Sequence, residues 1–293
     1  MNKTAAVVVT YNRKALLQQC ISCLLAQTAP CDILIIDNAS TDGTGDLFKH
    51  SQESLTYFNT GSNLGGAGGF NFGMRKAVEM GYEFVWVMDD DTLPNATAHE
   101  KLLEGDKKLN GNYGFLSSLV LWTDGTQCRM NIPKITKWKR LRAFNKMQGV
   151  QYASFVSLFL KSDTIKQFGL PYKEFFIWSD DWEYTRRISK KCSCFFVPES
   201  TVVHACVTNT GADIVSSPAD RLERFRYLYR NDVVLYRMDG FDGFIYLSMR
   251  VTFHIIKILL KSENKFKKIK LILSSLREGV KFRPVAELVG EEV

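Results

Sequence analysis

Three consecutive aspartates close a short apolar run in this sequence. Phe84–Met88 is followed directly by Asp89, Asp90 and Asp91. A short run rich in valine and aromatic residues is typical of a buried strand, and carboxylates at its end are costly to bury without a positive partner. Asp89 and Asp91 can converge on one divalent cation, since hard oxygen ligands suit Mg²⁺ or Mn²⁺. The alternative is an acidic turn before a helix, because 92–95 has turn and cap chemistry.

A second acidic group lies among aromatic residues in the segment Phe176–Tyr184. Asp180, Asp181 and Glu183 alternate there with aromatic side chains that include Trp178. Aromatic faces stack on sugar rings while carboxylates bind hydroxyls, so the segment predicts a sugar site. Apolar surroundings also raise the pKa of a carboxylate towards values useful to a general base. Alternatively, one aspartate caps a helix that begins here.

His204 follows the apolar segment Thr201–Val203, at the end of another predicted strand. A lone histidine is more often structural than a ligand. Beside a metal site that otherwise has two carboxylates, however, it is a candidate third ligand.

A glycine-rich loop runs from Asn63 to Gly69. Its glycines do not fit the first, third and sixth positions of the dinucleotide fingerprint, and no Gly-Lys-Ser/Thr of a P-loop follows. Gly65 and Gly66 would allow close backbone approach and leave N–H groups free near a helix N-terminus, which favours phosphate or sugar hydroxyls. Simple loop flexibility is the alternative.

The elements that position these residues alternate along the chain. The pattern predicts strands over 5–9, 32–37, 55–59 and 84–88, with helices over 14–26 and 70–80. Farther on it predicts strands over 113–121, 152–160, 195–197 and 201–203, and a helix over 180–190. Alternating strands and helices indicate crossover connections, and therefore an α/β fold with a doubly wound, mainly parallel, Rossmann-like sheet.

Polar groups follow each of the first strands. Thr10, Asn12 and Arg13 come after the first strand. Asp37 closes the second strand and Asn63 follows the third, while the three aspartates follow the fourth. The carboxyl ends of parallel strands meet at one edge, so we expect one crevice there. Asp37 either accepts hydrogen bonds from a base or ribose or caps its own turn.

These motifs, in this order, resemble family 2 glycosyltransferases of GT-A fold over about residues 5–235. The motifs that carry the resemblance are Val7–Arg13, Ile36–Thr44, Asp89–Asp91, Asp180–Glu183 and His204. The segments Asn63–Phe70 and Arg226–Asn231 look most like the galactofuranosyl- and rhamnosyltransferases of bacterial surface polysaccharide (O-antigen) synthesis.

The resemblance implies roles for individual residues. Asp89, Asp91 and His204 would bind a divalent metal, Mn²⁺ or Mg²⁺, and Asp181 would be the catalytic base. The residues expected to bind substrate are Thr10, Asn12, Arg13, Asp37, Asn63, Gly65, Gly66, Asp90, Trp178, Asp180 and Glu183. Trp182 departs from the small residue common in relatives, which bears on acceptor specificity.

The chemistry agrees with these roles. A nucleotide-sugar carries a diphosphate leaving group whose developing charge a metal stabilises, and one carboxylate suffices to deprotonate the acceptor hydroxyl. Single displacement inverts the anomeric centre. We therefore expect an inverting, metal-dependent enzyme that moves a sugar, best galactofuranose from UDP-galactofuranose, onto a glycan or lipid-linked acceptor in cell-surface polysaccharide synthesis.

Two other functions compete with this one. A dTDP-rhamnose-dependent rhamnosyltransferase of the same fold is the nearer alternative. A non-catalytic sugar-nucleotide or membrane-binding protein is the other, although such a protein has no use for a base such as Asp181. Nucleic acid is not expected as a partner, because no recognised motif accompanies the basic charge.

The charge and the cysteines bear on location. The formal net charge is +7, and Arg250–Arg283 holds ten Lys/Arg against two acidic residues. The start of the chain enters Val7–Val9 without a recognisable leader. Seven irregularly spaced cysteines suit a reducing cytosol, and the Cys20/Cys23 and Cys192/Cys194 pairs lack the partner pairs of zinc sites.

We expect a catalytic domain over 1–215 and a basic helical region over 216–293. Phe244–Leu260 is apolar but, interrupted by three polar residues, falls short of the roughly 20 apolar residues of a spanning helix. Lys261–Leu276 is cationic and partly amphipathic, with an apolar arc of Phe266, Ile269, Ile272, Leu273 and Leu276. This pattern predicts a cytoplasmic protein, peripheral on the inner face of the plasma membrane and bound to its anionic surface. Alternatively, the segment is a helical layer packed on the catalytic domain.

Overall fold

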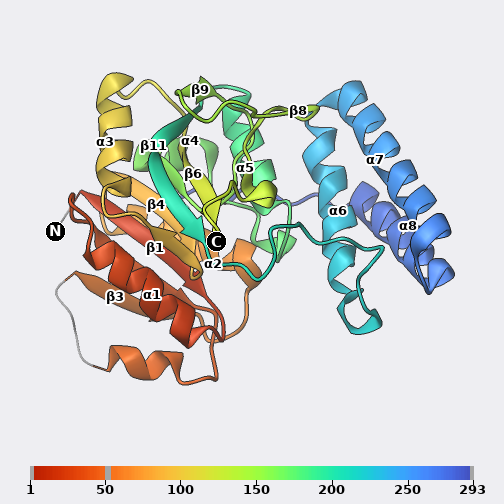
Figure 1. The fold of residues 1–293 in the computed structure, drawn as a ribbon, viewed down its shortest axis with the longest axis horizontal. Coiled ribbons are helices and arrows are strands. Elements are labelled where there is room, and N and C mark those ends of the chain that lie inside the picture. Colours follow the sequence, from red (N-terminus) through yellow and green to blue (C-terminus); the bar gives the residue numbers. More distant parts are fainter. Residues whose placement is uncertain (1–2, 50–53, 291–293) are drawn as a thin grey trace.

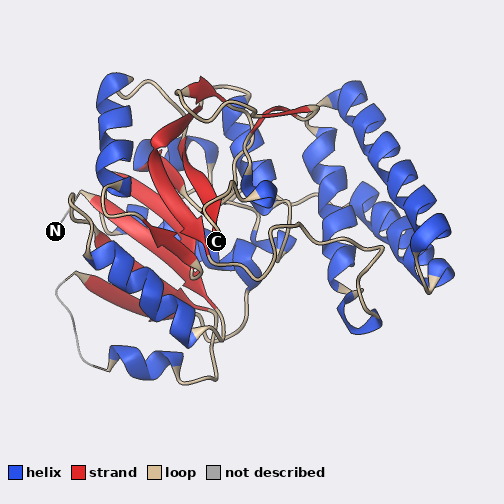
Figure 2. Ribbon diagram, viewed as in Figure 1, coloured by secondary structure: helices blue, strands red, loops and turns tan. Residues whose placement is uncertain are grey.

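The computed structural model describes residues 3–49 and 54–290, and its core is a nine-stranded mixed sheet (Figures 1 and 2). The strands of this sheet are β1 (Thr4–Thr10), β2 (Asp32–Asp37), β3 (Leu55–Asn59), β4 (Phe84–Asp89), β5 (Thr92–Pro94), β6 (Leu116–Trp122), β9 (Gln148–Gly149), β10 (Leu158–Lys161) and β11 (Phe195–His204). Their order is β3-β2-β1-β4-β10-β6-β11-β5, with β9 paired to β11. A separate hairpin joins β7 (Lys134–Thr136) to β8 (Lys139–Arg140).

Helices cover both faces of the sheet. The covering helices are α1 (Lys14–Leu25), α2 (Gly65–Glu79), α3 (Ala98–Lys108), α4 (Ser162–Phe168) and α5 (Asp180–Ser189). Three more helices follow, α6 (Arg224–Arg237), α7 (Gly240–Lys261) and α8 (Lys265–Lys281). Alternate residues of β1 enter different cores, because successive side chains of a strand point to opposite faces. Ala5, Val7 and Val9 pack with α2, α4 and α5, whereas Ala6 and Val8 pack with α1 and α3. The predicted α/β class with C-terminal helices is confirmed.

The first four strands pair in parallel, and the second half of the sheet is mixed. β1 lies between β2 and β4, and its register sets Thr10 opposite Asp37 and Val9 opposite Asp89. β10 is antiparallel to both neighbours, β4 and β6. The polar groups that end β1, β2 and β4 therefore share one edge, as the sequence predicts.

Several boundaries differ from the predictions. The strand predicted over 152–160 is confined to Leu158–Lys161, and the one over 113–121 begins at Leu116. The two short strands predicted over 195–203 are one strand, β11, whose pairing with β6 is irregular between Val197 and Thr201. Both halves of β11 still follow β6, so a local irregularity does not end the strand.

The glycine-rich loop is the first part of α2, which begins at Gly65 rather than near residue 70. A Cβ on Gly69 would lie 2.5 Å from Val9 Cγ1, and one on Gly73 would lie 2.4 Å from Val7 Cγ1. These two glycines allow α2 to pack closely on β1. Gly65 has φ +71°, and a Cβ there would lie 2.1 Å from the carbonyl oxygen of Phe176. Helix–sheet and helix–loop packing therefore account for much of the glycine cluster.

The three C-terminal helices form a layer at one side of the sheet (Figure 1). α6 packs against α7 and α8 around a small core that contains Leu222, Tyr229, Val251, Ile258 and Ile272. The buried face of α8 differs from the predicted arc, because Phe266 and Leu273 are exposed while Lys268 and Leu271 are buried. Lys268 Nζ donates to Val215 O and Ser262 Oγ, both at 2.8 Å, which explains how a lysine is tolerated inside.

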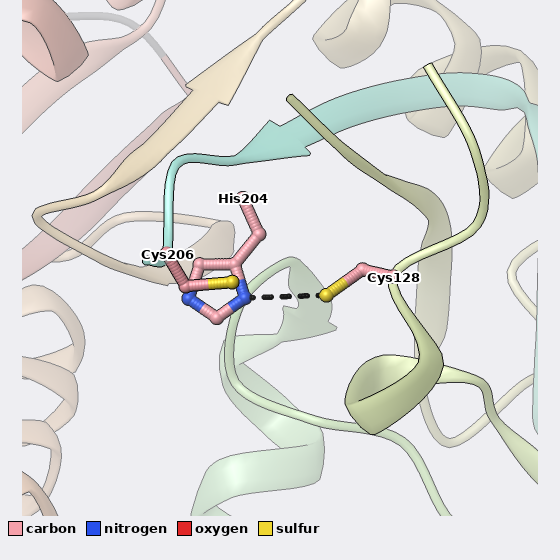
Figure 3. A group of neighbouring side chains, drawn as sticks. All are labelled: Cys128, His204 and Cys206. Carbon is pink, nitrogen blue, oxygen red and sulfur yellow. Dashed lines mark hydrogen bonds between the residues drawn. The ribbon is translucent and has the colours of Figure 1, made fainter. Parts of the chain in front are cut away.

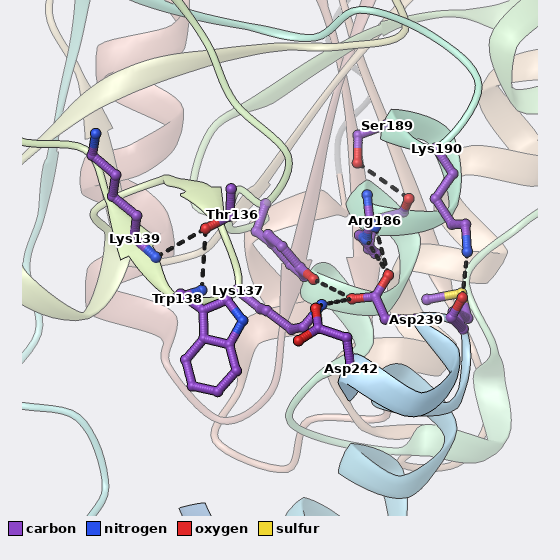
Figure 4. Close-up of polar contacts among 11 residues, drawn as sticks. Thr136, Lys137, Trp138, Lys139, Arg186, Ser189, Lys190, Asp239 and Asp242 are labelled. Atoms are coloured by element: carbon purple, nitrogen blue, oxygen red, sulfur yellow. Dashed lines mark hydrogen bonds and ion pairs between the residues drawn. The ribbon is translucent and has the colours of Figure 1, made fainter. Parts of the chain in front are cut away.

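Asp239, between α6 and α7, ties this layer to the sheet domain (Figure 4). Its carboxylate accepts hydrogen bonds from Arg186 Nε on α5 at 3.0 Å and from Lys137 Nζ in the β7–β8 hairpin at 3.1 Å. Tyr152 donates to it at 3.2 Å. Lys137 also pairs with Asp242 in the first turn of α7. The C-terminal helices are therefore anchored to the sheet domain by buried charges.

Among the described residues, α7 alone is long and apolar enough, by length and composition, to cross a membrane. Its most apolar 18-residue stretch has a mean hydropathy of 1.5 and is 17% buried. The expectation that this segment falls short of such a helix was therefore too strict.

Candidate active site

A cavity of about 760 Å³ opens where the sheet edge meets α5, α6 and α7. Six of the residues that line it were predicted as site residues: Gly66, Asp89, Trp178, Asp180, Asp181 and His204. The C-terminal helices close the other side with Phe225, Tyr229, Asp232, Arg250 and His254. The cavity thus brings together residues from both acidic motifs and from the later histidine.

Strand pairing sets His204 beside the aspartates. β11 runs antiparallel to β5, and His204 is opposite Thr92, the residue after Asp91. His204 Nε2 lies 3.2 Å from Asp91 Oδ1. On the other side of the ring, Nδ1 lies 2.9 Å from Asn131 Oδ1, an acceptor that favours a proton on Nδ1. With the ring neutral, Nε2 is then free to act as a metal ligand.

Asp90 and Asp91 are also held by the end of β1. Arg13 Nη1 lies 2.5 Å from Asp91 Oδ2 and 3.4 Å from Asp90 Oδ1. Thr10 Oγ1 donates to Asp90 Oδ2 at 2.7 Å. Asp90 therefore anchors the strand ends, while Asp89 is the member of the triple that lines the cavity.

The buried carboxylates of Asp89 and Asp91 favour a positive charge beside them. Burial and the neighbouring Asp91 raise the pKa of Asp89 to about 7. Burial alone would raise the pKa of Asp91, but His204 and Arg13 lower it below its usual range. Burial would lower the pKa of His204, yet its contacts with Asp91 and Cys128 raise it to about 10. A protonated imidazole therefore supplies the positive charge that the carboxylates need.

The residues present fit a divalent metal. Asp91 Oδ1 is buried and lies 3.2 Å from His204 Nε2, which puts an oxygen donor and a nitrogen donor side by side. Asp89 and Asp91 offer hard oxygen donors and His204 offers a nitrogen donor, a set suited to Mg²⁺ or Mn²⁺ once phosphate oxygens complete the shell.

Asp180 and Asp181 begin α5, where the positive end of the helix dipole favours carboxylates. Burial raises the pKa of Asp180 to about 6. Burial and the adjacent Asp180 raise the pKa of Asp181 well above its usual value. Asp181 Oδ1 accepts a hydrogen bond from the Trp182 amide at 2.7 Å. Both carboxylates line the cavity, so either has the position and the basicity for proton transfer.

The loop before α5 is strained. Phe176, Trp178 and Ser179 have φ of +62°, +67° and +63°, a region that such residues rarely adopt. Asn231 on α6 holds this loop through Nδ2, which donates to the carbonyls of Phe175 at 3.0 Å and of Trp178 at 2.9 Å. The geometry of the acidic motif therefore depends on α6.

The other predicted residues lie outside the cavity, and most have partners of their own. Asp37 accepts from Tyr57 Oη at 2.7 Å and from the Ser40 amide at 2.8 Å, which is the capping role. Asn12 Oδ1 accepts from the Thr41 amide, and Asn63 Oδ1 from the Gly65 amide. Glu183 is buried and paired with Arg187 at 2.9 Å, so its carboxylate serves α5 rather than the cavity. Gly65 contacts the Phe176 loop, as described above.

Three residues near the site are not among the site residues predicted from the sequence. Asn131 orients His204 from a loop, and Asn231 supports the strained segment. Lys134 is 4% exposed, with its ammonium 3.4 Å from the centroid of the Trp182 ring. Burial, with Arg250 and Arg140, lowers the pKa of Lys134 to about 6. Of the three, only Asn231 lies in a segment, Arg226–Asn231, that resembles the galactofuranosyl- and rhamnosyltransferases.

Comparison with known proteins agrees with this geometry. Residues 5–127 match the glycosyl transferase family 2 domain. The chain is 28% identical over 254 residues to galactofuranosyltransferase GlfT1 of Mycolicibacterium smegmatis, covering 80% of this chain and 83% of that protein. It is 29% identical over 247 residues to GlfT1 of Mycobacterium tuberculosis, covering 77% and 79%.

Solved structures share the fold. S. aureus TarS 1-349 superposes with a TM-score of 0.56 at 15% identity, covering 96% of this chain and 72% of that one. GalNAc-T7, solved with UDP, GalNAc and Mn²⁺, has a TM-score of 0.62 at 13% identity, covering 93% and 54%. At these identities the likeness concerns the fold alone. The chain therefore carries a glycosyl transferase family 2 domain in a GT-A-like fold, is homologous to the GlfT1 galactofuranosyltransferases, and is a glycosyltransferase.

Proposed function

We propose that this enzyme transfers galactofuranose from UDP-galactofuranose to a glycan or lipid-linked acceptor, with inversion and with a divalent metal, Mn²⁺ or Mg²⁺. The GlfT1 relatives support the sugar. The observation that supports the chemistry is a single cavity lined by Asp89, His204 and Asp181, which joins a metal-ligand set to a buried base.

Asp89, Asp91 and His204 Nε2 would hold the metal. Asp91 Oδ1 faces His204 Nε2 at 3.2 Å, so a metal that replaces the proton on Nε2 would find both donor atoms in reach. When bound, the metal stabilises the negative charge that develops on the leaving diphosphate. Mn²⁺ in the GalNAc-T7 structure supports a divalent ion for this fold.

Asp181 acts as the general base. It accepts the proton of the acceptor hydroxyl as the oxygen bonds to the anomeric carbon and the bond from that carbon to the diphosphate breaks. Its raised pKa makes it a stronger base than an exposed aspartate. Trp178 offers an apolar face to a sugar ring in the cavity, and Asp180 and Gly66 contribute polar groups. Arg13 holds Asp90 and Asp91, and Thr10 donates to Asp90. These residues would support the nucleotide side of the site, together with Asn12, Asp37 and Asn63 at the strand ends.

The outer face of α7 supports a membrane as the second partner. Every exposed residue of α7 between 244 and 260 is uncharged: Phe244, Ile245, Ser248, Met249, Thr252, Phe253, Ile256, Leu259 and Leu260. Two of its ionisable residues face inward, since Arg250 pairs with Asp232 at 3.2 Å and His254 Nδ1 lies 2.9 Å from Tyr229 Oη. The third, Lys257, is partly exposed, with its ammonium 4.8 Å from the centroid of the Phe253 ring. An amphipathic helix with its apolar side outward needs another apolar phase to cover it.

Basic residues adjoin this face. Lys261, Lys265, Lys267 and Lys270 are exposed at the turn from α7 to α8. Such a group attracts anionic headgroups while the apolar face enters the interface. We therefore propose that region 216–293 holds the catalytic domain 1–215 on the cytoplasmic face of the plasma membrane, near a lipid-linked acceptor.

A donor-hydrolysis screen tests the function. Purified protein is incubated with UDP-galactofuranose, UDP-galactose or dTDP-rhamnose, with Mn²⁺ or Mg²⁺ or with chelator. We expect metal-dependent release of UDP from UDP-galactofuranose above that from the other donors. Preference for dTDP-rhamnose would support the rhamnosyltransferase alternative, and binding without any turnover would support the non-catalytic one.

A further inference from the structure

Two thiols meet the imidazole of His204. Cys128 Sγ, Cys206 Sγ and a ring nitrogen of His204 all lie within 4.8 Å of one another (Figure 3). Cys128 is buried before the short 3₁₀ turn Arg129–Asn131, and Cys206 is partly exposed two residues after His204. Neither thiol belongs to the closely spaced pairs Cys20/Cys23 and Cys192/Cys194.

The spacing fits a tetrahedral cation. With Zn–S of about 2.3 Å and Zn–N of about 2.0 Å, ligand atoms around zinc lie about 3.5–3.8 Å apart. Cys128 Sγ lies 3.7 Å from His204 Nδ1. Small side-chain rotations would bring the three atoms to this geometry. His204 and Asn131 line the large cavity, which provides a path for an ion.

We propose that Cys128, Cys206 and Nδ1 of His204 form a second metal site, which takes a thiophilic cation such as Zn²⁺. Two thiolates and an imidazole select borderline-soft ions, whereas the oxygen donors of Asp89 and Asp91 select hard ones. Three protein ligands leave a fourth position open. The ion displaces both thiol protons and the proton on Nδ1, together with the hydrogen bond from Nδ1 to Asn131.

This site and the metal site of the proposed function compete for one ring. A neutral imidazole has one nitrogen lone pair, so an ion on Nδ1 leaves the proton on Nε2. The Nε2–H group then faces Asp91 Oδ1 as a donor, and His204 no longer binds a metal beside Asp91. This consequence rests on the proposed function, but the existence of the sulfur site does not. Thiophilic ions would thus act as antagonists of the catalytic metal.

Cobalt absorption tests the sulfur site without an activity assay. The reduced full-length protein is titrated anaerobically with Co²⁺, a coloured substitute for Zn²⁺. We expect a thiolate-to-cobalt charge-transfer band that saturates at one ion per chain and disappears on addition of Zn²⁺. Oxygen ligands such as Asp89 and Asp91 give no such band, so the two sites are distinguished.

Cysteine variants assign the band. Cys128→Ser and Cys206→Ser should each lose it, while the matched control Cys192→Ser/Cys194→Ser should keep it. Melting temperature and near-ultraviolet circular dichroism check the folding of each variant, and partly exposed Cys206 is the safer substitution. No band in the wild-type protein, or an undiminished band in folded Cys206→Ser, overturns the site.

The competition has its own test. Excess Mn²⁺ with UDP should weaken Co²⁺ binding at the sulfur site at least about tenfold, because the loss of a hydrogen-bond partner of a metal ligand alone already costs about that much affinity. If the charge-transfer band is present but insensitive to Mn²⁺ and UDP, the sulfur site stands and the coupling through His204 is wrong.

Discussion

Nε2 of His204 lies 3.2 Å from Oδ1 of Asp91, and this contact joins the end of β11 to the turn between β4 and β5. The other oxygen of Asp91 contacts Arg13, so the carboxylate sits between two positive groups from distant segments. Because the neighbouring carboxylates are buried, positive charge beside them stabilises their ionised forms. Arg13 supplies part of this charge, and the contacts of His204 with Asp91 and Cys128, which raise the pKa of the imidazole to about 10, favour its charged form as well.

Removing a metal ligand should abolish metal-dependent turnover. Asp91→Ala and His204→Ala should each lower kcat/KM at least about 100-fold, because stabilisation of the leaving diphosphate is lost. Arg13 is half-exposed and tolerates loss of Asp91, so both proteins should fold. UDP release with Mn²⁺ and with chelator measures the effect, and exposed Asp46→Asn serves as the control. Full activity of chelator-treated His204→Ala would refute the metal assignment.

Asp181→Asn should lower kcat about 10²–10⁴-fold with little change in KM for the donor, as expected for loss of a general base. Asp180→Asn should be milder. Because burial and Asp180 raise the pKa of Asp181, the wild-type rate should fall as the pH falls through that raised value. Single-turnover rates across pH 5–9 measure both effects. A stronger defect in Asp180→Asn would show that the base is its neighbour instead.

Asn231→Ala should reduce both stability and turnover. Its side chain donates to carbonyls of the loop 175–178, whose buried acceptors would lose their partners at a cost of about 1–3 kcal/mol. The strained loop would then relax and move Asp180 and Asp181 out of position. Urea unfolding and kcat measure the two effects, with exposed Asn145→Ala as the control. Loss of stability without loss of kcat at low temperature would argue against a positioning role.

Lys134→Met should stabilise the protein. Among the described residues, the ammonium of Lys134 has no hydrogen bond or ion pair, and burial lowers its pKa to about 6. Between pH 6 and its usual value near 10.5 the unfolded chain binds one more proton, so wild-type stability should rise with pH across this window. The variant should lose that slope and gain up to a few kcal/mol at pH 7.

Lys137→Met is the matched control for this change. Lys137 pairs with Asp239 and Asp242, so its removal should destabilise the protein instead (Figure 4). Thermal melts at pH 6, 7.5 and 9 compare the two variants. If Lys134→Met also lowers the melting temperature at pH 7.5, the contact of the ammonium with the Trp182 ring outweighs the cost of burying the lysine.

Charges on the outer face of α7 should prevent membrane binding. Phe253→Glu, at a position that is 55% exposed, should reduce co-sedimentation with anionic liposomes at low salt without unfolding the protein. Leu25→Glu, 54% exposed on α1, is the control and should bind as wild type. Neutral liposomes and high salt should weaken binding, because the lysines near α8 contribute electrostatically. Wild-type protein that ignores anionic vesicles would exclude attachment through this face.

Local pattern alone determined much of the catalytic half. The apolar runs of β1, β2 and β4 alternate with helical segments along the chain, a pattern that predicts buried parallel strands. Because parallel strands point the same way, the polar residues at their ends share one edge of the sheet. The sequence also marked the three aspartates and the acidic motif among aromatic residues as candidate site residues. Carboxylates beside buried apolar segments are costly to bury unless they have a function or a positive partner.

Only the tertiary structure decided which side chains meet. His204 reaches Asp91 through the antiparallel pairing of β11 with β5, and Asn131 and Cys128 reach His204 from a loop, none of which has a local signal. Glu183 faces Arg187 rather than the cavity because of its phase on α5. The apolar face of α7 points outward because Arg250 on α7 forms an ion pair with Asp232 on α6. This contact joins two helices, so the periodicity of α7 alone does not predict it.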